Sequence, residues 1–251
     1  MRIVKVIGVG MGNPRHLTAE AMEALRSIDV FFVLEKGSAA DELVKLRRDL
    51  CGAVIGAGDY RFVTVPDPPR DRSRSDYQRA VADWTGARSD VLLDTMEAHL
   101  GPGQTAGILA WGDPAFYDGT LRMLDNGRAA ARLEVEVIPG ISSIQLLAAA
   151  HRISLTRVGR PLQVTTGRRL AEEGFPAGCD DVVVMLDASC SFQHVDPAGV
   201  QIYWGVDLGG PDQAIVSGEL REVTDAIVSR RAEIRSRRGW VMDTYLLRRE
   251  I

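Results

Sequence analysis

The stretch IVKVIGVGMGNPRHLT (3–18) decides the fold of this chain. It begins as an alternating run of β-branched residues, which predicts a buried strand, and then turns through three glycines. Thr18 follows, a residue type that favours helix N-termini because its hydroxyl accepts a backbone N–H. The apolar run DVFFVL (29–34) predicts a second strand. These elements form a β-α-β unit with a right-handed crossover, so the sequence predicts an α/β fold that begins with a mostly parallel sheet.

Two later stretches, TAGILAWGDPAFYDGT (105–120) and EVEVIPGISSIQ (134–145), repeat the pattern of an apolar run followed by a sharp turn. In an open α/β sheet, ligands bind at the edge formed by the carboxyl ends of the strands. Because all three turns follow strands of one predicted sheet, we expect them to converge at that edge and to form a ligand site.

The second half of the chain is organised differently. Its strands follow one another with few helices between them, which predicts a mixed sheet and a second domain. We place the boundary at about residue 140, giving domains 1–140 and 141–251, and an alternative boundary lies at Thr156–Pro161. The expected strands are 3–9, 29–34, 61–65, 106–110, 133–138, 161–167, 181–188, 200–206, 213–220 and 240–247. Besides the helix that Thr18 begins, the expected helices are 39–50, 76–100, 118–131, 143–150, 221–237 and part of 187–197.

The composition is that of an ordinary globular protein. The 251 residues are 45% hydrophobic and 25% charged, with a net charge of −4, whereas nucleic-acid-binding domains usually carry a basic footprint. No apolar run is long enough to cross a bilayer and no signal-peptide pattern opens the chain, so we expect a cytoplasmic protein with no membrane partner. Three cysteines without a CxxC pattern and four scattered histidines predict neither a disulfide framework nor a metal site.

The glycines of the first turn, Gly8, Gly10 and Gly12, are similar to a dinucleotide-binding fingerprint but do not match it. That fingerprint requires a third glycine where Asn13 stands, and Pro14 removes a backbone N–H that a pyrophosphate would use. A ligand that the backbone approaches closely but that carries no phosphate, such as S-adenosylmethionine, fits the turn better. A nicotinamide-dependent (NAD) oxidoreductase, and a turn that serves only strand–helix packing, stay open as alternatives.

The three turns together resemble the tetrapyrrole methylase family, also called the corrin/porphyrin methyltransferases. The motifs that carry the resemblance are G-x-G-x-G-x-P-x-x-L-T at Gly8–Thr18, W-G-D-P-A-F-Y at Trp111–Tyr117 and P-G-I-S-S at Pro139–Ser143. The resemblance implies two α/β domains with S-adenosylmethionine bound in a cleft between them, and a small-molecule tetrapyrrole as substrate. It also implies a homodimer, which is common among relatives.

Segments that extend beyond these turns narrow the resemblance within the family. They include DVFFVLEKG (29–37), IPGISSIQLLAAAHRI (138–153), VGRPLQVTTGRRL (158–170) and IYWGVDLGGPDQAIVSGEL (202–220). They are similar to the branch that acts in cobalamin biosynthesis and methylates precorrin-5 at ring carbon C1 with release of acetate. A methyltransferase of the same fold that acts on another tetrapyrrole carbon or on RNA stays open as an alternative.

Carried over position by position, the resemblance implies a set of cofactor contacts in both domains. They are Gly10, Pro14, Trp111, Gly112, Asp113, Phe116, Ser142, Ser143, Met185, Leu186 and Gly218. Simpler interpretations stay open for several of them. Asp113 is of the type that hydrogen-bonds its own turn, the two serines are of the type that caps helices, and Gly218 is of the type that marks a strand bulge.

Acetate release needs a general base and a group that stabilises an oxyanion. Glu35, Tyr117 and Asp118 lie on or near the turns and are the candidate catalytic residues. The substrate carries many carboxylates, which arginine binds well. The candidate arginines are Arg70, Arg72, Arg74, Arg152, Arg157, Arg160, Arg168 and Arg169. The stretch 66–76 has the composition of a surface loop, and the sequence leaves open whether it acts as a lid.

Overall fold

The structure, a computed structural model, describes residues 2–34, 39–69 and 76–249. The chain consists of two compact units, Met1–Ser142 and Ser143–Ile251, whereas the sequence analysis placed the boundary at about residue 140. We call them the N-terminal and C-terminal units and describe each by itself.

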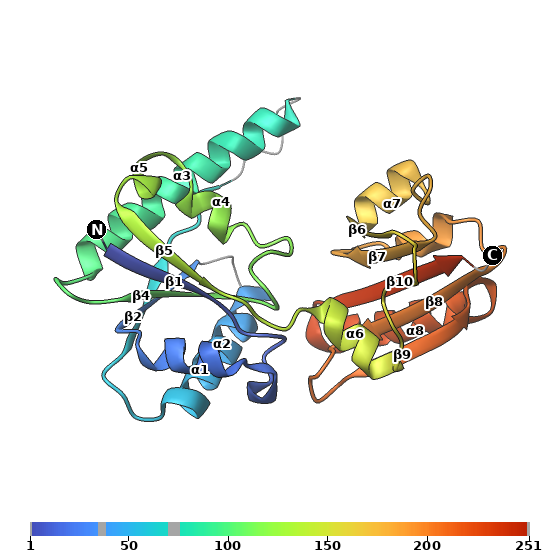
Figure 1. Cartoon of the computed structure of the whole chain (residues 1–251), viewed down its shortest axis with the longest axis horizontal. Coiled ribbons are helices and arrows are strands. Elements are labelled where there is room, and N and C mark those ends of the chain that lie inside the picture. Colours follow the sequence, from blue (N-terminus) through green and yellow to red (C-terminus); the bar gives the residue numbers. More distant parts are fainter. Residues whose placement is uncertain (1, 35–38, 70–75, 250–251) are drawn as a thin grey trace. The chain divides into compact units, whose positions relative to one another are not determined.

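The N-terminal unit is built on a sheet of five strands in the order β3-β2-β4-β1-β5. Every neighbouring pair is parallel, which confirms the predicted parallel sheet (Figure 1). The strands are β1 (Arg2–Gly8), β2 (Val30–Leu34), β3 (Arg61–Val65), β4 (Ala106–Ala110) and β5 (Leu133–Ile138). β1 and β2 arise from apolar runs rich in β-branched and aromatic residues, the composition that favours strands. β4 is wholly buried, whereas β5 alternates apolar residues with glutamates.

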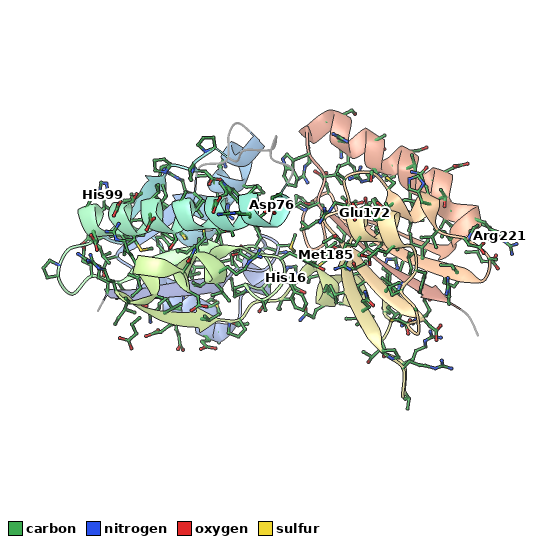
Figure 2. The ribbon with its side chains drawn as sticks, turned by 90° about the horizontal axis from the view of Figure 1, so that it is seen from above. His16, Asp76, His99, Glu172, Met185 and Arg221 are labelled. Carbon is green, nitrogen blue, oxygen red and sulfur yellow. The ribbon has the colours of Figure 1, made fainter. Side chains whose placement is uncertain are left out.

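Helices cover both faces of this sheet (Figure 1). One face packs against α1 (Ala19–Arg26) and α2 (Ala39–Ile55), and the other against α3 (Tyr77–His99), α4 (Thr120–Leu124) and α5 (Gly127–Ala130). Figure 2 labels Asp76 and His99 at the two ends of α3, where the Asp76 side chain caps the first turn.

One helix prediction in this unit is wrong. The sequence predicted a single helix over 118–131, but α4 and α5 are separate because Asn126 adopts an extended conformation (φ −109°, ψ 135°). Asparagine and the glycine that follows it are both weak helix formers, so the break carries a small energetic penalty.

The connections of this sheet reverse direction between β1 and β4. The crossover after β1 carries α1 on one face, and the connection after β4 carries α4 and α5 on the other. Adjacent strands whose connections leave in opposite directions open a crevice at their carboxyl ends, which is where open α/β sheets bind ligands. The first and second turns lie at this point.

The C-terminal unit contains a mixed sheet in the order β6-β7-β10-β8-β9. β6 and β7 are parallel, and the other neighbours are antiparallel, as the sequence predicted. The strands are β6 (Leu162–Thr166), β7 (Asp181–Met185), β8 (Val200–Val206), β9 (Ala214–Glu219) and β10 (Asp243–Arg249). The helices are α6 (Ser143–His151), α7 (Gly167–Glu173) and α8 (Leu220–Arg238).

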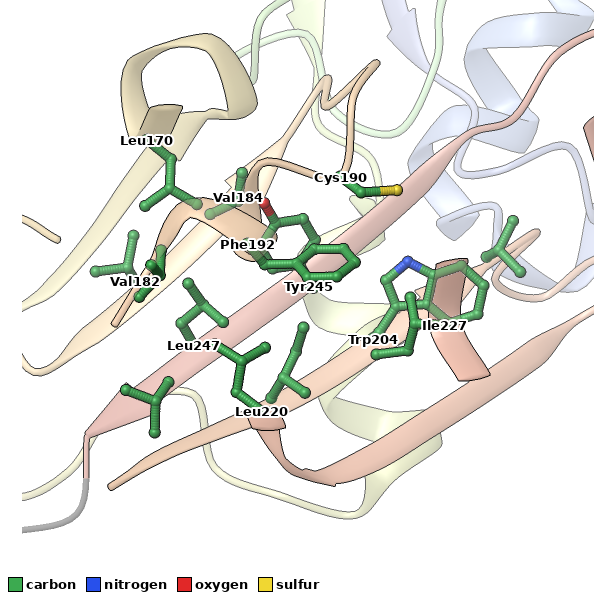
Figure 3. Close-up of a cluster of buried hydrophobic side chains, with 14 of the residues drawn as sticks. Leu170, Val182, Val184, Cys190, Phe192, Trp204, Leu220, Ile227, Tyr245 and Leu247 are labelled. Atoms are coloured by element: carbon green, nitrogen blue, oxygen red, sulfur yellow. The ribbon is translucent and has the colours of Figure 1, made fainter. Parts of the chain in front are cut away.

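The core of the C-terminal unit lies between its sheet and α8 and α7. Figure 3 shows the Phe192 and Tyr245 rings together in this cluster and Ile227 of α8 beside Trp204. Leu220 of α8 and Leu170 of α7 belong to the same cluster. The helix predicted within 187–197 is only a 3-10 turn, Ser191–His194, because Cys190 before it is left-handed (φ +57°). Among the described helices, none has the length and apolar character that a membrane span requires.

Candidate functional site

The three turns predicted to form a site lie together at the carboxyl edge of the N-terminal sheet. The backbone N–H of Gly10 donates to the carbonyl oxygen of Gly112 at 3.2 Å, and the N–H of Gly112 donates to the carbonyl of Gly10 at 2.7 Å. This reciprocal pair joins the first turn to the second beyond the ends of β1 and β4. Both glycines have positive φ (+62° and +64°), a conformation that costs glycine little.

The backbone of the third turn packs directly against the backbone of the other two. A Cβ on Gly140 would lie 2.2 Å from the carbonyl oxygen of Gly112 and 2.7 Å from the carbonyl carbon of Gly8. A Cβ on Gly8 would lie 2.5 Å from the nitrogen of Gly140. No side chain fits between these segments, so the glycines are what allow the three turns to meet.

Asp113 ties the second turn to the third. Its Oδ1 accepts the N–H of Ala115 at 2.8 Å, which is the local turn bond that its residue type favours. Its Oδ2 accepts the N–H of Gly140 at 2.9 Å, 27 residues away. Both carboxylate oxygens therefore bind backbone, and the side chain holds the edge of the site in shape.

The remaining predicted contacts of the N-terminal unit surround this junction. Pro14 opens a 3-10 turn, Pro14–His16, in which the Asn13 side chain accepts the N–H of Arg15. The Trp111 ring lies so close to Gly12 that a Cβ added there would be 3.0 Å from it, and Phe116 donates its N–H to the carbonyl of Asp113 at 3.1 Å. Ser142, the last residue of the unit, is buried.

In the C-terminal unit, Met185 and Leu186 lie where β7 ends, and Figure 2 labels Met185. Leu186 is left-handed (φ +53°) and 66% exposed. Strained, exposed residues of this kind cluster at ligand sites. Ser143 begins α6, and its hydroxyl accepts a hydrogen bond from Thr244 at 2.8 Å.

Sequence reasoning missed the residue that holds the Leu186 turn, Asp187. Its buried carboxylate accepts the N–H of Ser191 at 2.6 Å and the hydroxyl of Tyr245 at 2.7 Å. Burial, with Asp187 beside it, raises the pKa of Tyr245 well above its usual value, so the phenol stays protonated and keeps donating. The sequence analysis placed Asp187 inside the expected strand 181–188, whereas β7 ends at Met185.

Gly218 does not lie beside Met185 and Leu186. It pairs with Ile202 of β8, and β10 and β8 separate its strand, β9, from β7. Three strand spacings of about 4.8 Å each put β9 roughly 14 Å across the sheet from β7. The structure therefore groups Met185 with Leu186 but leaves Gly218 apart.

The structure describes two of the three candidate catalytic residues, Tyr117 and Asp118. Tyr117 is left-handed (φ +52°) and 45% exposed. Asp118 accepts the N–H of Thr120 on one oxygen, Oδ1, at 2.8 Å. Glu35 lies outside the described residues. Within the described part of the chain, no group of three or more His, Cys, Asp or Glu residues is arranged to hold a metal ion.

Several candidate arginines already have carboxylate partners in their own unit. Arg157 pairs with the buried Asp181 at 2.8 Å, and Arg160 pairs with Asp180 at 3.0 Å. Arg169 pairs with Glu173 one helical turn away at 2.6 Å. The backbone of Arg152 is left-handed (φ +58°). Arg168 already has an interaction partner. Arg70, Arg72 and Arg74, with most of the predicted surface loop 66–76, lie outside the described residues.

A cavity of about 140 Å³ lies in the N-terminal unit next to the second turn, and no sequence pattern indicated it. Arg47 of α2 lines it together with Trp111, Asp118 and apolar residues from the ends of β2 and β4. The Arg47 guanidinium lies 5.0 Å from the Trp111 ring centre, and its Nε donates to the carbonyl of Leu109 at 3.3 Å. Burial lowers the pKa of Arg47 to about 10, and the carboxylate of Asp118 opposes this shift.

Comparison with known proteins agrees with this arrangement. A family model described as Tetrapyrrole (Corrin/Porphyrin) Methylases matches residues 4–224. A protein from Sinorhizobium sp named precorrin-6A synthase (deacetylating) is 42% identical over 99% of this chain and 96% of its own length. A precorrin-2 C(20)-methyltransferase from the same source is 30% identical, but over only 55% of this chain and 53% of its own.

A solved structure shares the whole fold. It is a putative cobalamin synthesis related protein (CobF) from Corynebacterium diphtheriae, with a TM-score of 0.83 and 31% sequence identity, covering 99% of each chain.

Proposed function

Because the chain belongs to the tetrapyrrole (corrin/porphyrin) methylase family, we propose that it methylates precorrin-5 at ring carbon C1 and releases acetate, giving precorrin-6A. The methyl donor is S-adenosylmethionine. The observation that carries the proposal is the 42% identity to a precorrin-6A synthase (deacetylating) along essentially the full length of both chains. The branch-specific segments of the sequence, which extend beyond the shared turns, support the same choice.

The turns of the N-terminal unit suit this donor. Glycine backbone meets at the carboxyl edge of the sheet where no Cβ fits, and Pro14 withholds an N–H that a phosphate would use. S-adenosylmethionine carries no phosphate and supplies a methyl group on a sulfonium when bound. We propose that Gly10, Pro14, Gly112 and the backbone around Trp111 contact it from this unit, with Phe116, Ser142 and Ser143 nearby.

Asp113 acts in this proposal as a positioning residue. Its two oxygens bind backbone N–H groups of the second and third turns, so it fixes the shape of the edge that the donor contacts. From the C-terminal unit, we propose that Met185 and Leu186 contact the adenosine. Gly218 has the weakest support of the predicted contacts because of its distance from them across the sheet.

Methyl transfer from a sulfonium is an in-line displacement, so the protein contributes mainly proximity and orientation. In well-aligned intramolecular reactions these supply up to roughly 7–11 kcal/mol. The nucleophile is a carbon of the substrate, and the chain therefore needs no nucleophilic side chain for this step.

The decisive experiment supplies purified protein with precorrin-5 and S-adenosylmethionine labelled with ¹³C in the methyl group. The expected result is one labelled methyl at ring carbon C1 and one equivalent of free acetate, seen by NMR. Label at another ring carbon, or methylation without acetate, would instead favour another methyltransferase of the same fold. RNA offered in place of precorrin-5 is expected to gain no label.

Ligand binding separates this proposal from the oxidoreductase alternative. Calorimetry is expected to detect S-adenosylhomocysteine binding and no binding of NAD. The comparisons offer no support for an oxidoreductase, and the first turn lacks the third glycine of the dinucleotide fingerprint.

We also propose that the protein works as a homodimer in the cytoplasm, which rests on the family resemblance and on the composition. Light scattering of the purified protein is expected to give about twice the chain mass of 27.4 kDa. A mass equal to a single chain at working concentration would contradict the dimer.

A further inference from the structure

The cavity beside the second turn has no role in the methyl-transfer step proposed above, but its size and its charged side chains suit a different step. Its volume is about 140 Å³. Pockets that enclose drug-sized ligands run from roughly 300 to 1,000 Å³, whereas a cavity of about 150 Å³ admits benzene. The cavity therefore fits one small substituent and not a macrocycle or a nucleoside.

Two donors in the cavity have unused hydrogen-bonding capacity. The terminal nitrogens of Arg47 make no hydrogen bond with any described residue, and no described carboxylate oxygen lies within 4.0 Å of its guanidinium. The indole N–H of Trp111 is buried and has no acceptor in the described part of the chain. A buried donor without a partner costs about 1–3 kcal/mol, so the Trp111 indole favours an oxygen-bearing ligand. The half-buried Arg47 guanidinium offers its charge and terminal nitrogens to the same ligand.

The other charged groups at the cavity are accounted for. Arg88 also lines it, but its Nε lies 2.7 Å from a carboxylate oxygen of Asp67, so its charge is compensated. Asp118 uses Oδ1 to accept the N–H of Thr120, and its Oδ2 has no partner among the described residues. The cavity thus holds, among the described residues, one cation without a close partner, Arg47, and one carboxylate with an available oxygen.

On the basis of the proposed function, we propose that this cavity receives the acetyl group of the substrate, with Asp118 as the general base and Arg47 as the stabiliser of the oxyanion and of the departing acetate. A water oxygen bonds to the acetyl carbonyl carbon as Asp118 takes one of its protons. The bond between that carbon and ring carbon C1 then breaks, and its electron pair stays on C1, which takes the methyl group from the sulfonium. The water's second proton passes to solvent as acetic acid ionises.

The charge pattern favours this step over permanent binding of a substrate carboxylate. A carboxylate arm entering the cavity would meet ionised Asp118, and the two like charges would repel. A neutral acetyl group would not. When acetate forms, Asp118 has become protonated, so the cavity holds one positive and one negative charge both before and after the reaction.

Two variants test the proposal. Asp118→Asn keeps the oxygen that accepts the Thr120 N–H but removes the base, and general-base catalysis typically contributes about 10²–10⁴-fold. Arg47→Met keeps the length of the side chain, and removal of an oxyanion donor typically lowers kcat about 10²–10³-fold. Both are expected to lower acetate release by at least about 100-fold while leaving S-adenosylhomocysteine affinity within about threefold of wild type. Arg47→Lys, which keeps the charge, is expected to recover part of the loss.

The matched controls are Arg48→Met, an exposed arginine of the same helix, and Asp125→Asn, an exposed aspartate at the end of α4. Both are expected to turn over as wild type does. A second readout needs no turnover. In Asp118→Asn, which lacks the repelling charge, ¹³C-labelled acetate alone is expected to show line broadening, and the broadening is expected to persist when Arg48→Met is added and to vanish when Arg47→Met is added.

Several outcomes would overturn the proposal. Wild-type rates in Asp118→Asn or Arg47→Met would do so, as would failure of Arg47→Lys to recover any activity in a folded protein. A rise only in the KM for precorrin-5 would assign the cavity to a carboxylate arm, and a loss only of S-adenosylhomocysteine affinity would assign it to the methionine carboxylate. Failure of wild type to methylate precorrin-5 would refute the proposed function, whereas Arg47-dependent acetate binding would still support the cavity assignment.

Discussion

Replacing Gly140 with alanine tests whether the three turns meet through backbone contact. The added Cβ would lie 2.2 Å from the carbonyl oxygen of Gly112, whereas ordinary contacts begin near 3.4 Å, so one segment must move by about 1.2 Å. The atoms in the way belong to backbone and have no rotamer to change. The same movement disturbs the hydrogen bond from the Gly140 N–H to Asp113.

The magnitude follows from these two effects. Overpacking of a tight site costs about 1–3 kcal/mol, and a hydrogen bond to a charged group contributes about 1.5–3 kcal/mol. Together they predict a loss of roughly 3–5 kcal/mol in unfolding free energy, which corresponds to a fall of roughly 10–17 °C in melting temperature for a unit of this size. We also expect S-adenosylhomocysteine affinity to drop at least tenfold, because the edge of the site moves.

Gly52→Ala is the matched control. It lies inside α2, and an added Cβ there would meet nothing within 4 Å. Alanine in a helix interior is about 0.5–1 kcal/mol more favourable than glycine, so this variant is expected to melt slightly above wild type and to bind normally. Thermal melts and calorimetry on both variants decide the matter. If Gly140→Ala melted and bound as Gly52→Ala does, the argument that backbone contact shapes the site would be refuted.

Three further predictions concern stability, pH and thiol chemistry. Asp113→Ala removes both hydrogen bonds that this carboxylate accepts from backbone N–H groups. It is expected to lower the unfolding free energy, measured in urea, by about 2–4 kcal/mol. An unchanged urea midpoint would contradict the role of Asp113 in joining the second turn to the third. Burial lowers the pKa of His151, whose ring Nε2 lies 3.0 Å from the carbonyl oxygen of Trp204. Because the unfolded state then binds more protons than the folded state, the unfolding free energy should fall as the pH drops below about 6.5. The fall should be smaller in His151→Gln. Burial raises the pKa of the Cys51 thiol to about 12, and all three cysteines are buried. A thiol reagent at about pH 8 should therefore label them only after denaturation. Rapid labelling of the native protein would contradict this expectation.

Local sequence predicted the strands and the junction of the turns well because both depend on local chemistry. The runs before Gly8 and Trp111 are strongly apolar, and the run before Pro139 alternates apolar residues with glutamates, a period-2 pattern that predicts a strand. Parallel strands of one sheet necessarily bring their carboxyl ends to one edge. The helix α7 (Gly167–Glu173) was missed because its seven residues are too few to show a helical period.

The cavity around Arg47 escaped prediction for a different reason. An arginine on a helix usually lies on the solvated face, and nothing near Arg47 in the sequence indicates burial. Its surroundings come from segments more than 60 residues further along, at Leu109, Trp111 and Asp118. Only tertiary packing brings these residues together, and the same holds for Asp187 and its partner Tyr245, 58 residues apart.

The position of β1 within its sheet has a consequence for how the N-terminal unit folds. This strand pairs with β4 on one side and with β5 on the other, so Val4 lies beside both Ala106 and Val135. Until more than a hundred residues have been ordered, β1 has no neighbour to pair with, and such long-range closure slows folding toward the millisecond-to-second range. A nascent or truncated chain lacking residues 106–138 would expose an apolar strand with unpaired backbone on both sides, which is the kind of segment that aggregates.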